Sequence, residues 1–246
     1  ILRRFTYQNR PIRRWNGCTL LAVDGSHVQI PSDIHDEATY FNSTKGGRGY
    51  NLLHLNALYD LESQLYLDAV IQDGREEHES RALVELVDRS ELTEPAILIA
   101  DRGYEAYNNM AHIEQKGWKY LIRVKDKRGI LSGLKLPDAL EFDTAFSYFL
   151  SKRLTNRIRR EPQKYRWIPS KVHFDYIRDK SDALYPISFR VVRFAVKEGL
   201  YETVITNLPA DRFPPSLLRE LYHKRWGILS FAINFTKNSS DQPKYL

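Results

Sequence analysis

The chain has 246 residues, of which 42% are hydrophobic and 12% aromatic, as in an ordinary folded globular protein. Its net charge of +6 favours an anionic partner, and its single cysteine excludes both an internal disulfide and a zinc site built from thiols. The sequence has neither an apolar run of roughly 18 residues nor a signal-peptide core, so we expect no membrane span and a cytoplasmic location. Because the chain begins without Met, we expect it to be a fragment of a longer protein.

The first predicted element is a strand that ends in a carboxylate. Residues 1–16 are rich in arginine, which is typical either of a solvated linker or of an arm that touches phosphates. The apolar run at 20–23 then predicts a strand, and Asp24 follows at its C-terminal end. The glycines of residues 45–49 predict a flexible basic loop.

A hairpin is predicted next. Its strands span residues 50–59 and 64–71, and the turn at 60–63 joins them. His54 lies inside the first of these strands, where it is either a hydrogen-bonded core residue or a ligand.

The stretch 76–89 predicts an amphipathic helix, because its apolar residues recur at helical spacing. Acidic residues in its first turn suit the positive end of the helix dipole. His78 stands between Glu77 and Glu79, a pattern that is compatible with a metal cluster. We interpret these three residues as a charged helix start.

A second buried strand, residues 96–100, also ends in an acid, Asp101. A carboxylate beside a core needs a metal, a cation or hydrogen bonds, although Asp101 alone could equally cap the helix predicted at 105–115. The repetition of strand, Asp and Gly at Asp24 and Asp101 favours two carboxylates side by side in one sheet. Such paired oxygen ligands suit Mg²⁺ or Mn²⁺, and their usual chemistry is two-metal phosphoryl transfer.

The elements up to a strand at 118–124 predict a mixed α/β sheet flanked by helices. Residues 130–206 show short alternating pieces between Pro, Asp and Gly, which predicts a mainly β insertion. Its densest basic and aromatic patch is the candidate nucleic-acid surface, with a solvated charge run as the alternative. The candidate DNA contacts in this patch are Arg157, Arg159, Arg160 and Lys164.

The stretch 214–216, Pro-Pro-Ser, predicts the start of a last helix that continues over 217–228. Tyr222, Arg225 and position 229 are spaced i, i+3 and i+7, so they share one face of that helix. An aromatic ring, a guanidinium and a carboxylate there would bind a phosphate and complete a metal site. Position 229, however, is Leu229.

Four motifs in this order resemble those of the DDE transposases of the IS4 insertion-sequence family. They are Val23-Asp24-Gly25-Ser26, Ala100-Asp101-Arg102-Gly103-Tyr104, Lys119-Tyr120-Leu121-Ile122-Arg123-Val124-Lys125 and Tyr222-His223-Lys224-Arg225-Trp226. The resemblance covers nearly all of residues 18–228. It implies an RNase H-like sheet that presents two Asp and one Glu to two Mg²⁺ ions, with a β-rich insertion between the second Asp and the Glu.

By this resemblance, Asp24 and Asp101 are the first two members of the catalytic, metal-binding triad, with Mg²⁺ or Mn²⁺ as cofactor. Tyr222 and Arg225 match the start of the family signature Tyr-x2-Arg-x3-Glu-x6-Lys, whose residues contact transposon-end phosphates. The implied mechanism is in-line attack of water on the phosphodiester at a transposon end, followed by attack of the freed 3′ hydroxyl on target DNA. The implied partners are double-stranded DNA and a second copy in a synaptic complex, at the nucleoid of a bacterium.

The motifs also divide the chain into expected regions. These are a basic arm at 1–16, the first part of the catalytic core at 17–128, the β-rich insertion at 129–208, the C-terminal core helix at 209–236 and an aberrant tail at 237–246.

The end of the chain departs from the signature. Leu229 and Thr236 stand where the signature has Glu and Lys, and Lys237 comes one place late. Glu220 points to the opposite face of the helix, and Asp241 follows residues that do not favour helix, so neither replaces the missing Glu. We therefore expect a frameshifted or truncated copy with defective cleavage.

Three functions remain open at this point. The first is a defective DDE transposase catalytic domain, and the second is a catalytically dead DNA-binding fragment that competes with intact transposase. The third is a metal-dependent nuclease with a different third ligand, which requires an acid that the sequence pattern does not reveal.

Overall fold

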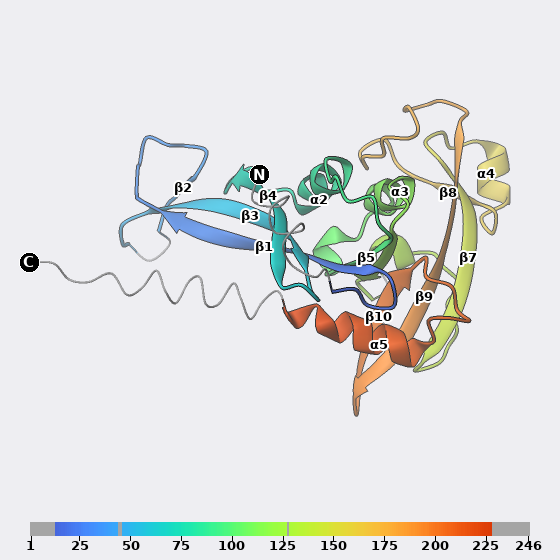
Figure 1. The fold of residues 1–246 in the computed structure, drawn as a ribbon. Coiled ribbons are helices and arrows are strands. Elements are labelled where there is room, and N and C mark those ends of the chain that lie inside the picture. The colour runs from blue at the N-terminus through green and yellow to red at the C-terminus, as the bar shows by residue number, and fades with distance from the viewer. Residues whose placement is uncertain (1–12, 44–45, 127, 228–246) are drawn as a thin grey trace, which may run out of the picture.

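The computed structural model describes residues 13–43, 46–126 and 128–227. Within them one sheet of ten strands runs through the whole molecule, in the order β2-β3-β1-β5-β6-β10-β9-β7-β8, with β4 paired to β3 (Figure 1). The strands are β1 (Thr19–Ile30), β2 (Tyr40–Phe41), β3 (Tyr50–Asp60), β4 (Leu65–Asp73), β5 (Ala96–Ala100), β6 (Lys119–Arg123), β7 (Phe142–Ser151), β8 (Tyr165–Trp167), β9 (Leu184–Lys197) and β10 (Leu200–Thr206). The helices are α2 (Glu79–Asp88), α3 (Tyr107–Gln115), α4 (Asn156–Arg160) and α5 (Pro215–Lys224), with short 3₁₀ turns η1 (Arg102–Tyr104) and η2 (Gly129–Leu131).

The centre of the sheet is mixed in strand direction. Strand β1 runs antiparallel to β3 and parallel to β5, and β5 runs parallel to β6. In the β1–β5 register Val23 lies opposite Ala100, so Asp24 and Asp101 each come directly after the last pair of this ladder, although Asp24 remains paired with Ala57 of β3. The mixed α/β sheet flanked by helices that the sequence predicts is confirmed.

Helices cover both faces of these central strands, because each strand is apolar on both sides. Helices α2 and α3 lie on one face, where Leu21 and Leu98 of the sheet belong to the same core cluster as Leu86 and Met110. Helix α5 covers the other face, where Leu20, Ile97 and Ile99 cluster with Leu218, Leu221 and Tyr222 (Figure 1). The core is therefore split by the sheet into two layers.

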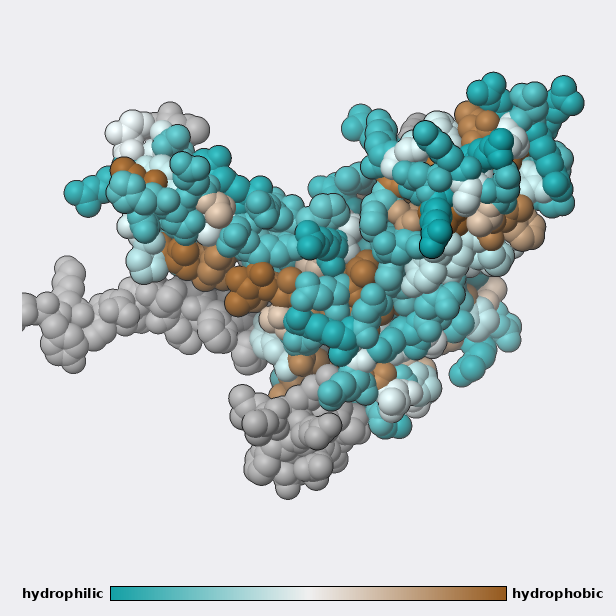
Figure 2. All heavy atoms as spheres, turned by 90° about the horizontal axis from the view of Figure 1, so that it is seen from above, coloured by the Kyte–Doolittle hydropathy of each residue, from teal (hydrophilic) through white to brown (hydrophobic). Residues whose placement is uncertain are grey.

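The strands of residues 142–206 extend the same sheet. Strand β10 pairs antiparallel with β6, β9 pairs with β10, and β7 pairs with β9. Arg190 of β9 fixes the chain that leads to α5, since its Nη1 donates to the carbonyls of Leu208 at 2.8 Å and Phe213 at 3.2 Å. Arg190 is 8% exposed, and its guanidinium also pairs with Asp143 of β7. From above, the molecule shows two hydrophilic projections with a notch between them (Figure 2).

The predicted helices exist, but α2 and α3 begin later than the sequence pattern suggests, whereas α5 begins at Pro215, within the predicted start. Helix α2 starts at Glu79, because His78 takes the N-cap position and its Nδ1 accepts from the Arg81 amide. Helix α3 starts at Tyr107, since the residues after Asp101 first form η1. No helix in the described part of the chain is long and apolar enough to cross a bilayer. The predictions for residues 1–12 and for Leu229, Thr236 and Lys237 lie outside the described residues.

Candidate active site

Two carboxylates stand side by side, Asp24 within β1 and Asp101 directly after β5. The prediction that the first strand ends at Asp24 is wrong, because β1 continues to Ile30 through its pairing with β3. Asp24 Oδ1 accepts a hydrogen bond from the amide of Gly25 at 3.1 Å, and Asp101 Oδ1 accepts one from the amide of Arg102 at 2.7 Å. Asp101 thus caps the short turn η1 rather than the helix predicted at 105–115, since Ala106 takes the N-cap position of α3. Burial raises the pKa of Asp24, Arg225 opposes that shift, and the charge of Asp101 adds to it.

Helix α5 presents Tyr222 and Arg225 to this pair from the other face of the sheet. The Arg225 Nη1 lies 3.8 Å from Asp24 Oδ2, and its Nη2 lies 3.9 Å from Asp101 Oδ2. The Tyr222 hydroxyl donates to Asp101 Oδ1 at 3.4 Å, and burial raises the pKa of Tyr222 to about 12. Arg225 is only 2% exposed, yet its Nε has no hydrogen-bond partner in the described residues. One guanidinium therefore bridges two carboxylates at distances too long for strong hydrogen bonds.

Glu79, at the start of α2, approaches the same pair from the α2 and α3 face. A methyl group on Gly103 would overlap Glu79 Oε2 and lie 3.2 Å from Oε1, so the carboxylate rests against the turn that follows Asp101. Burial raises the pKa of Glu79, and the charges of Asp24 and Asp101 raise it as well. The sequence interpretation of Glu79 as part of a charged helix start did not reveal this position.

Polar side chains of β3, the strand paired with β1, lie beside Asp24. The Tyr104 hydroxyl donates to Asn56 Oδ1 at 3.0 Å, and Asn56 Nδ2 donates to His54 Nδ1 at 3.1 Å. A methyl group on Gly25 would lie 2.7 Å from His54 Nε2, which leaves glycine as the residue that fits there. His54 is thus a buried, hydrogen-bonded residue next to Asp24.

A comparison of the sequence with protein families decides the classification. The profile of the family described as "Transposase DDE domain" matches residues 15–228, which is most of the chain. The chain belongs to the transposase DDE domain family. Of the solved structures, the domain is similar to piggyBac transposase in its "synaptic complex with hairpin DNA", at 8% identity and a TM-score of 0.49. That match covers 89% of this chain and 40% of the other, so the domain spans two fifths of that chain's length. No curated protein matches the sequence.

The residues of this DDE domain fit a divalent cation. Asp24 and Asp101 offer carboxylate oxygens, the ligands that Mg²⁺ and Mn²⁺ prefer, from the adjacent strands β1 and β5. The guanidinium of Arg225 lies between them, and its unpartnered Nε–H is a donor that suits a phosphate oxygen rather than the cation. A different donor set lies nearby, since ligand atoms of His27, His54 and Glu77 fall within 4.8 Å of one another. His27 Nε2 and Glu77 Oε2 already hydrogen-bond at 2.6 Å, so this group is satisfied without an ion.

A basic pocket opens next to Asp101. Arg123 Nη1, at the end of β6, lies 3.7 Å from Asp101 Oδ1 and 3.7 Å from Glu202 Oε1. Arg123 also lines a pocket of about 480 Å³ together with Arg102, Lys125 and Arg128. In the sequence this Lys- and Arg-rich segment marks only a boundary between regions, because nothing in its pattern shows that it folds back beside Asp101.

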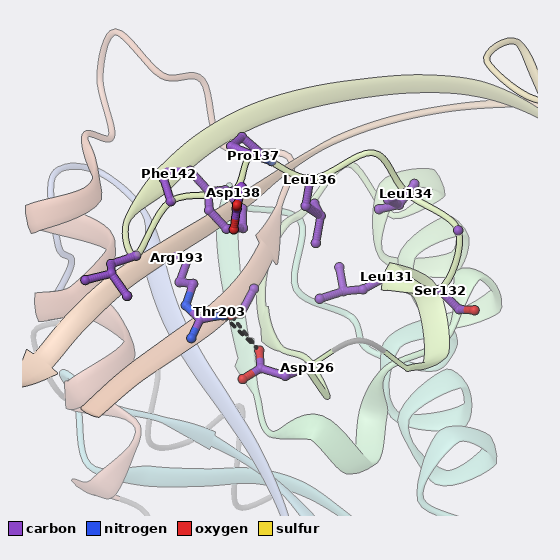
Figure 3. A pocket seen from close by; sticks show the side chains of 13 residues that line it. Asp126, Leu131, Ser132, Leu134, Leu136, Pro137, Asp138, Phe142, Arg193 and Thr203 are labelled. Atoms are coloured by element: carbon purple, nitrogen blue, oxygen red, sulfur yellow. Dashed lines mark hydrogen bonds and ion pairs between the residues drawn. The ribbon is translucent and has the colours of Figure 1, made fainter. Parts of the chain in front are cut away.

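A larger pocket of about 750 Å³ adjoins the basic one, since both include Asp126 and Thr203 (Figure 3). Its wall is the loop that follows η2 together with Phe142 of β7 and Arg193 of β9. Thr203 Oγ1 of β10 donates to Asp126 Oδ1 at 2.8 Å and so ties this loop region to the sheet. The two pockets together extend from Arg123, beside Asp101, toward the strands of the insertion.

The candidate DNA-binding patch of the insertion lies elsewhere. Arg157, Arg159 and Arg160 belong to α4, and α4 packs on β8, the last strand of the sheet. Five strand spacings separate β8 from β5, which is roughly 24 Å at about 4.8 Å per strand. Arg157 and Lys164 stack over the Tyr165 ring at 5.2 and 5.5 Å. The structure therefore brings Tyr222 and Arg225 to the acidic pair but not the α4 patch.

Proposed function

We propose that this DDE domain is the catalytic part of an IS4-type insertion-sequence transposase that cuts and joins DNA with Mg²⁺ or Mn²⁺. The observation that carries the proposal is the meeting of Asp24, Asp101 and Arg225 at one sheet edge, within a chain that belongs to the transposase DDE domain family. The proposed partners are double-stranded DNA and, in a synaptic complex, a second copy of the protein. The proposed location is the bacterial cytoplasm, at the nucleoid.

Each residue of the site has a role that its position supports. Asp24 and Asp101 would hold the cation, which supplies Lewis-acid activation and charge neutralisation when bound. Arg225 is buried and fixed by α5, so its guanidinium can orient a non-bridging phosphate oxygen between the carboxylates. The Tyr222 hydroxyl keeps its proton at neutral pH and can donate to the same phosphate. Cleavage joins the water oxygen to phosphorus and releases the 3′ oxygen with a proton, and this 3′ hydroxyl then attacks target DNA.

The basic pocket is a candidate binding site for the DNA strand that flanks the cleaved phosphodiester. Arg102, Lys125 and Arg128 are exposed and line it, and Arg123 connects it to Asp101. Cations at such positions bind the phosphate backbone without reading sequence. We propose that the DNA flanking the scissile phosphate lies in this pocket.

Cleavage of a labelled duplex that carries the element's own end tests the function. We expect slow cleavage by this chain and a rate at least about 100-fold higher in Leu229→Glu, equivalent to about 2.7 kcal/mol of transition-state stabilisation. The double variant Leu229→Glu, Asp101→Asn should bind the duplex but not cut it in Mn²⁺. Specific binding without cleavage by Leu229→Glu would contradict the proposal.

The second candidate is a competitor that binds transposon ends without cutting them. This candidate is favoured because the proposed phosphate contacts Tyr222 and Arg225 lie at the acidic pair, whereas residue 229 is Leu and not the Glu of the signature. Both candidates occupy transposon ends, so either lowers the cleavage by the Leu229→Glu variant in proportion to its share of a mixture. Cleavage by this chain alone separates them, because a slow enzyme cuts the duplex by itself, whereas a competitor does not.

A further inference from the structure

The carboxylate of Glu79 lies within the acidic site, although it comes from a helix on the opposite face of the sheet from α5. It lies so close to Gly103, two residues after Asp101, that a methyl group there would displace it. Asp24 and Asp101 both act electrostatically on Glu79, and all three charges act on the hydroxyl of buried Tyr104. The three carboxylates therefore share one environment.

Glu79 has no hydrogen-bond or ion-pair partner among the residues that the structure describes. Glu105, an acid of similar burial, differs in this respect: it accepts from the amides of Lys125 at 2.9 Å and Ile130 at 2.6 Å. Glu77, two residues before Glu79, is bonded to His27. A half-buried carboxylate without a partner costs free energy, and here it faces two further carboxylates.

The arginines of the site pair with the two Asp but not with Glu79. In the described residues Arg225 forms ion pairs with Asp24 and Asp101, and Arg123 forms one with Asp101. Of the charges that act on Glu79, that of His54 opposes the effect of burial, whereas those of Asp24 and Asp101 add to it. Arg225 is 2% exposed, points at the carboxylates and retains an unpartnered Nε–H, a donor that an anionic phosphate oxygen would satisfy.

We propose that Glu79 is the third carboxylate ligand of the cation that Asp24 and Asp101 hold. The inference rests on the proposed function of that pair. It supplies the acid that the last helix lacks, because residue 229 is Leu. Cation binding then survives in this chain, while the absence of Glu at 229 affects the rate of cleavage.

Binding of Mn²⁺ alone, followed by titration calorimetry and by the loss of the free-ion electron paramagnetic resonance signal, tests the role of Glu79. We expect Glu79→Gln to weaken Mn²⁺ binding at least about tenfold. The control Glu76→Gln removes the same charge from an exposed side chain three residues earlier and should bind Mn²⁺ as the wild type does. Wild-type affinity in Glu79→Gln, with lost affinity in Asp101→Asn, would overturn the role of Glu79 and leave the proposed function standing.

Two further measurements keep the result independent of folding. Gly103→Ala retains all three acids but fills the space of the Glu79 carboxylate, so we expect it to weaken Mn²⁺ binding as Glu79→Gln does. In EDTA, Glu79→Gln should melt no lower than the wild type, because it removes a repelled carboxylate, and in Mn²⁺ it should gain less in Tm. Unchanged Mn²⁺ affinity in Asp101→Asn, or no Mn²⁺ binding by the wild type, would overturn the proposed metal site as well.

Discussion

Without a bound cation, Arg225 is the residue that offsets the negative charges of both Asp24 and Asp101. It joins Asp24 and Asp101 across the edge of the sheet and stacks over the rings of Tyr222 at 5.6 Å and Trp226 at 4.9 Å. Its burial means that the ion pairs are poorly screened by solvent. The carboxylates are 20% and 32% exposed, so the pairs stabilise less than fully buried ones.

Replacement of Arg225 by Met keeps the aliphatic packing and removes the charge. We expect a loss of about 2 kcal/mol in the free energy of unfolding at pH 7 in EDTA, since two carboxylates then repel each other without compensation. Burial already holds the pKa of Asp24 above its usual value of 3.8, so the folded protein favours the protonated carboxyl group. This contribution to the free energy of unfolding is present at low pH and is lost as pH rises through the raised pKa. Removing Arg225 raises that pKa further and enlarges the loss.

The difference between Arg225→Met and the wild type should therefore shrink as pH falls below about 4. Urea unfolding at pH 7 and at pH 3.5 measures it, and Arg225→Lys, which keeps the charge, serves as the control. An equal loss at both pH values would show that Arg225 acts through packing rather than through the carboxylates.

Helix α5 carries Tyr222 and Arg225, and its position depends on a buried contact far along the helix from the acidic pair. Arg190 of β9 donates to the carbonyls of Leu208 and Phe213, just before α5 begins at Pro215. The same guanidinium pairs with Asp143 of β7. One side chain therefore links two strands of the insertion to the start of the helix that completes the site.

Arg190→Met should destabilise the protein by about 3 kcal/mol, because it leaves two buried carbonyls and a carboxylate without their donor. Amide hydrogen exchange should quicken in α5 more than in α2, since the contact fixes the start of α5. Arg193→Met is the matched control: Arg193 is also on β9, and its pair with Asp126 spans 4.0 Å at the surface, so its loss should cost less than about 1 kcal/mol. Equal effects of the two variants would contradict the linking role of Arg190.

The sequence predicts those parts of the site that depend on local pattern. Asp24 and Asp101 follow short apolar runs, and the adjacency of parallel strands is enough to bring them together, although β1 continues past Asp24 to Ile30. Glu79 could not be recognised in this way, because its position depends on how α2 packs against η1. The available signal was the acidic helix start with His78 as its cap. The β character of the insertion was also predictable, but the pairing of β10 with β6, about 80 residues earlier, was not.

At the scale of the whole molecule, two basic surfaces lie on one sheet. The basic pocket adjoins Asp101, and the α4 patch lies at the far edge beside β8. Roughly 24 Å separates β8 from β5, which corresponds to about 7 base pairs of duplex at about 3.4 Å each. A net charge of +6 spread in this way suits a DNA duplex that runs along the sheet from the cut toward the insertion.

The length of the duplex should therefore decide which basic residues matter. For a 10-bp duplex centred on the cleavage position, which reaches about 17 Å on either side, we expect Arg102→Ala with Arg128→Ala to weaken binding and to lower the salt slope of log K by about 2. Arg159→Ala with Arg160→Ala removes the same charge from exposed positions of α4 and should change binding only for a 40-bp duplex. Fluorescence anisotropy between 50 and 200 mM salt gives both slopes. If the α4 variant weakened the short and long duplexes equally, the DNA would have to cross the sheet by another path, with the α4 patch close to the cut.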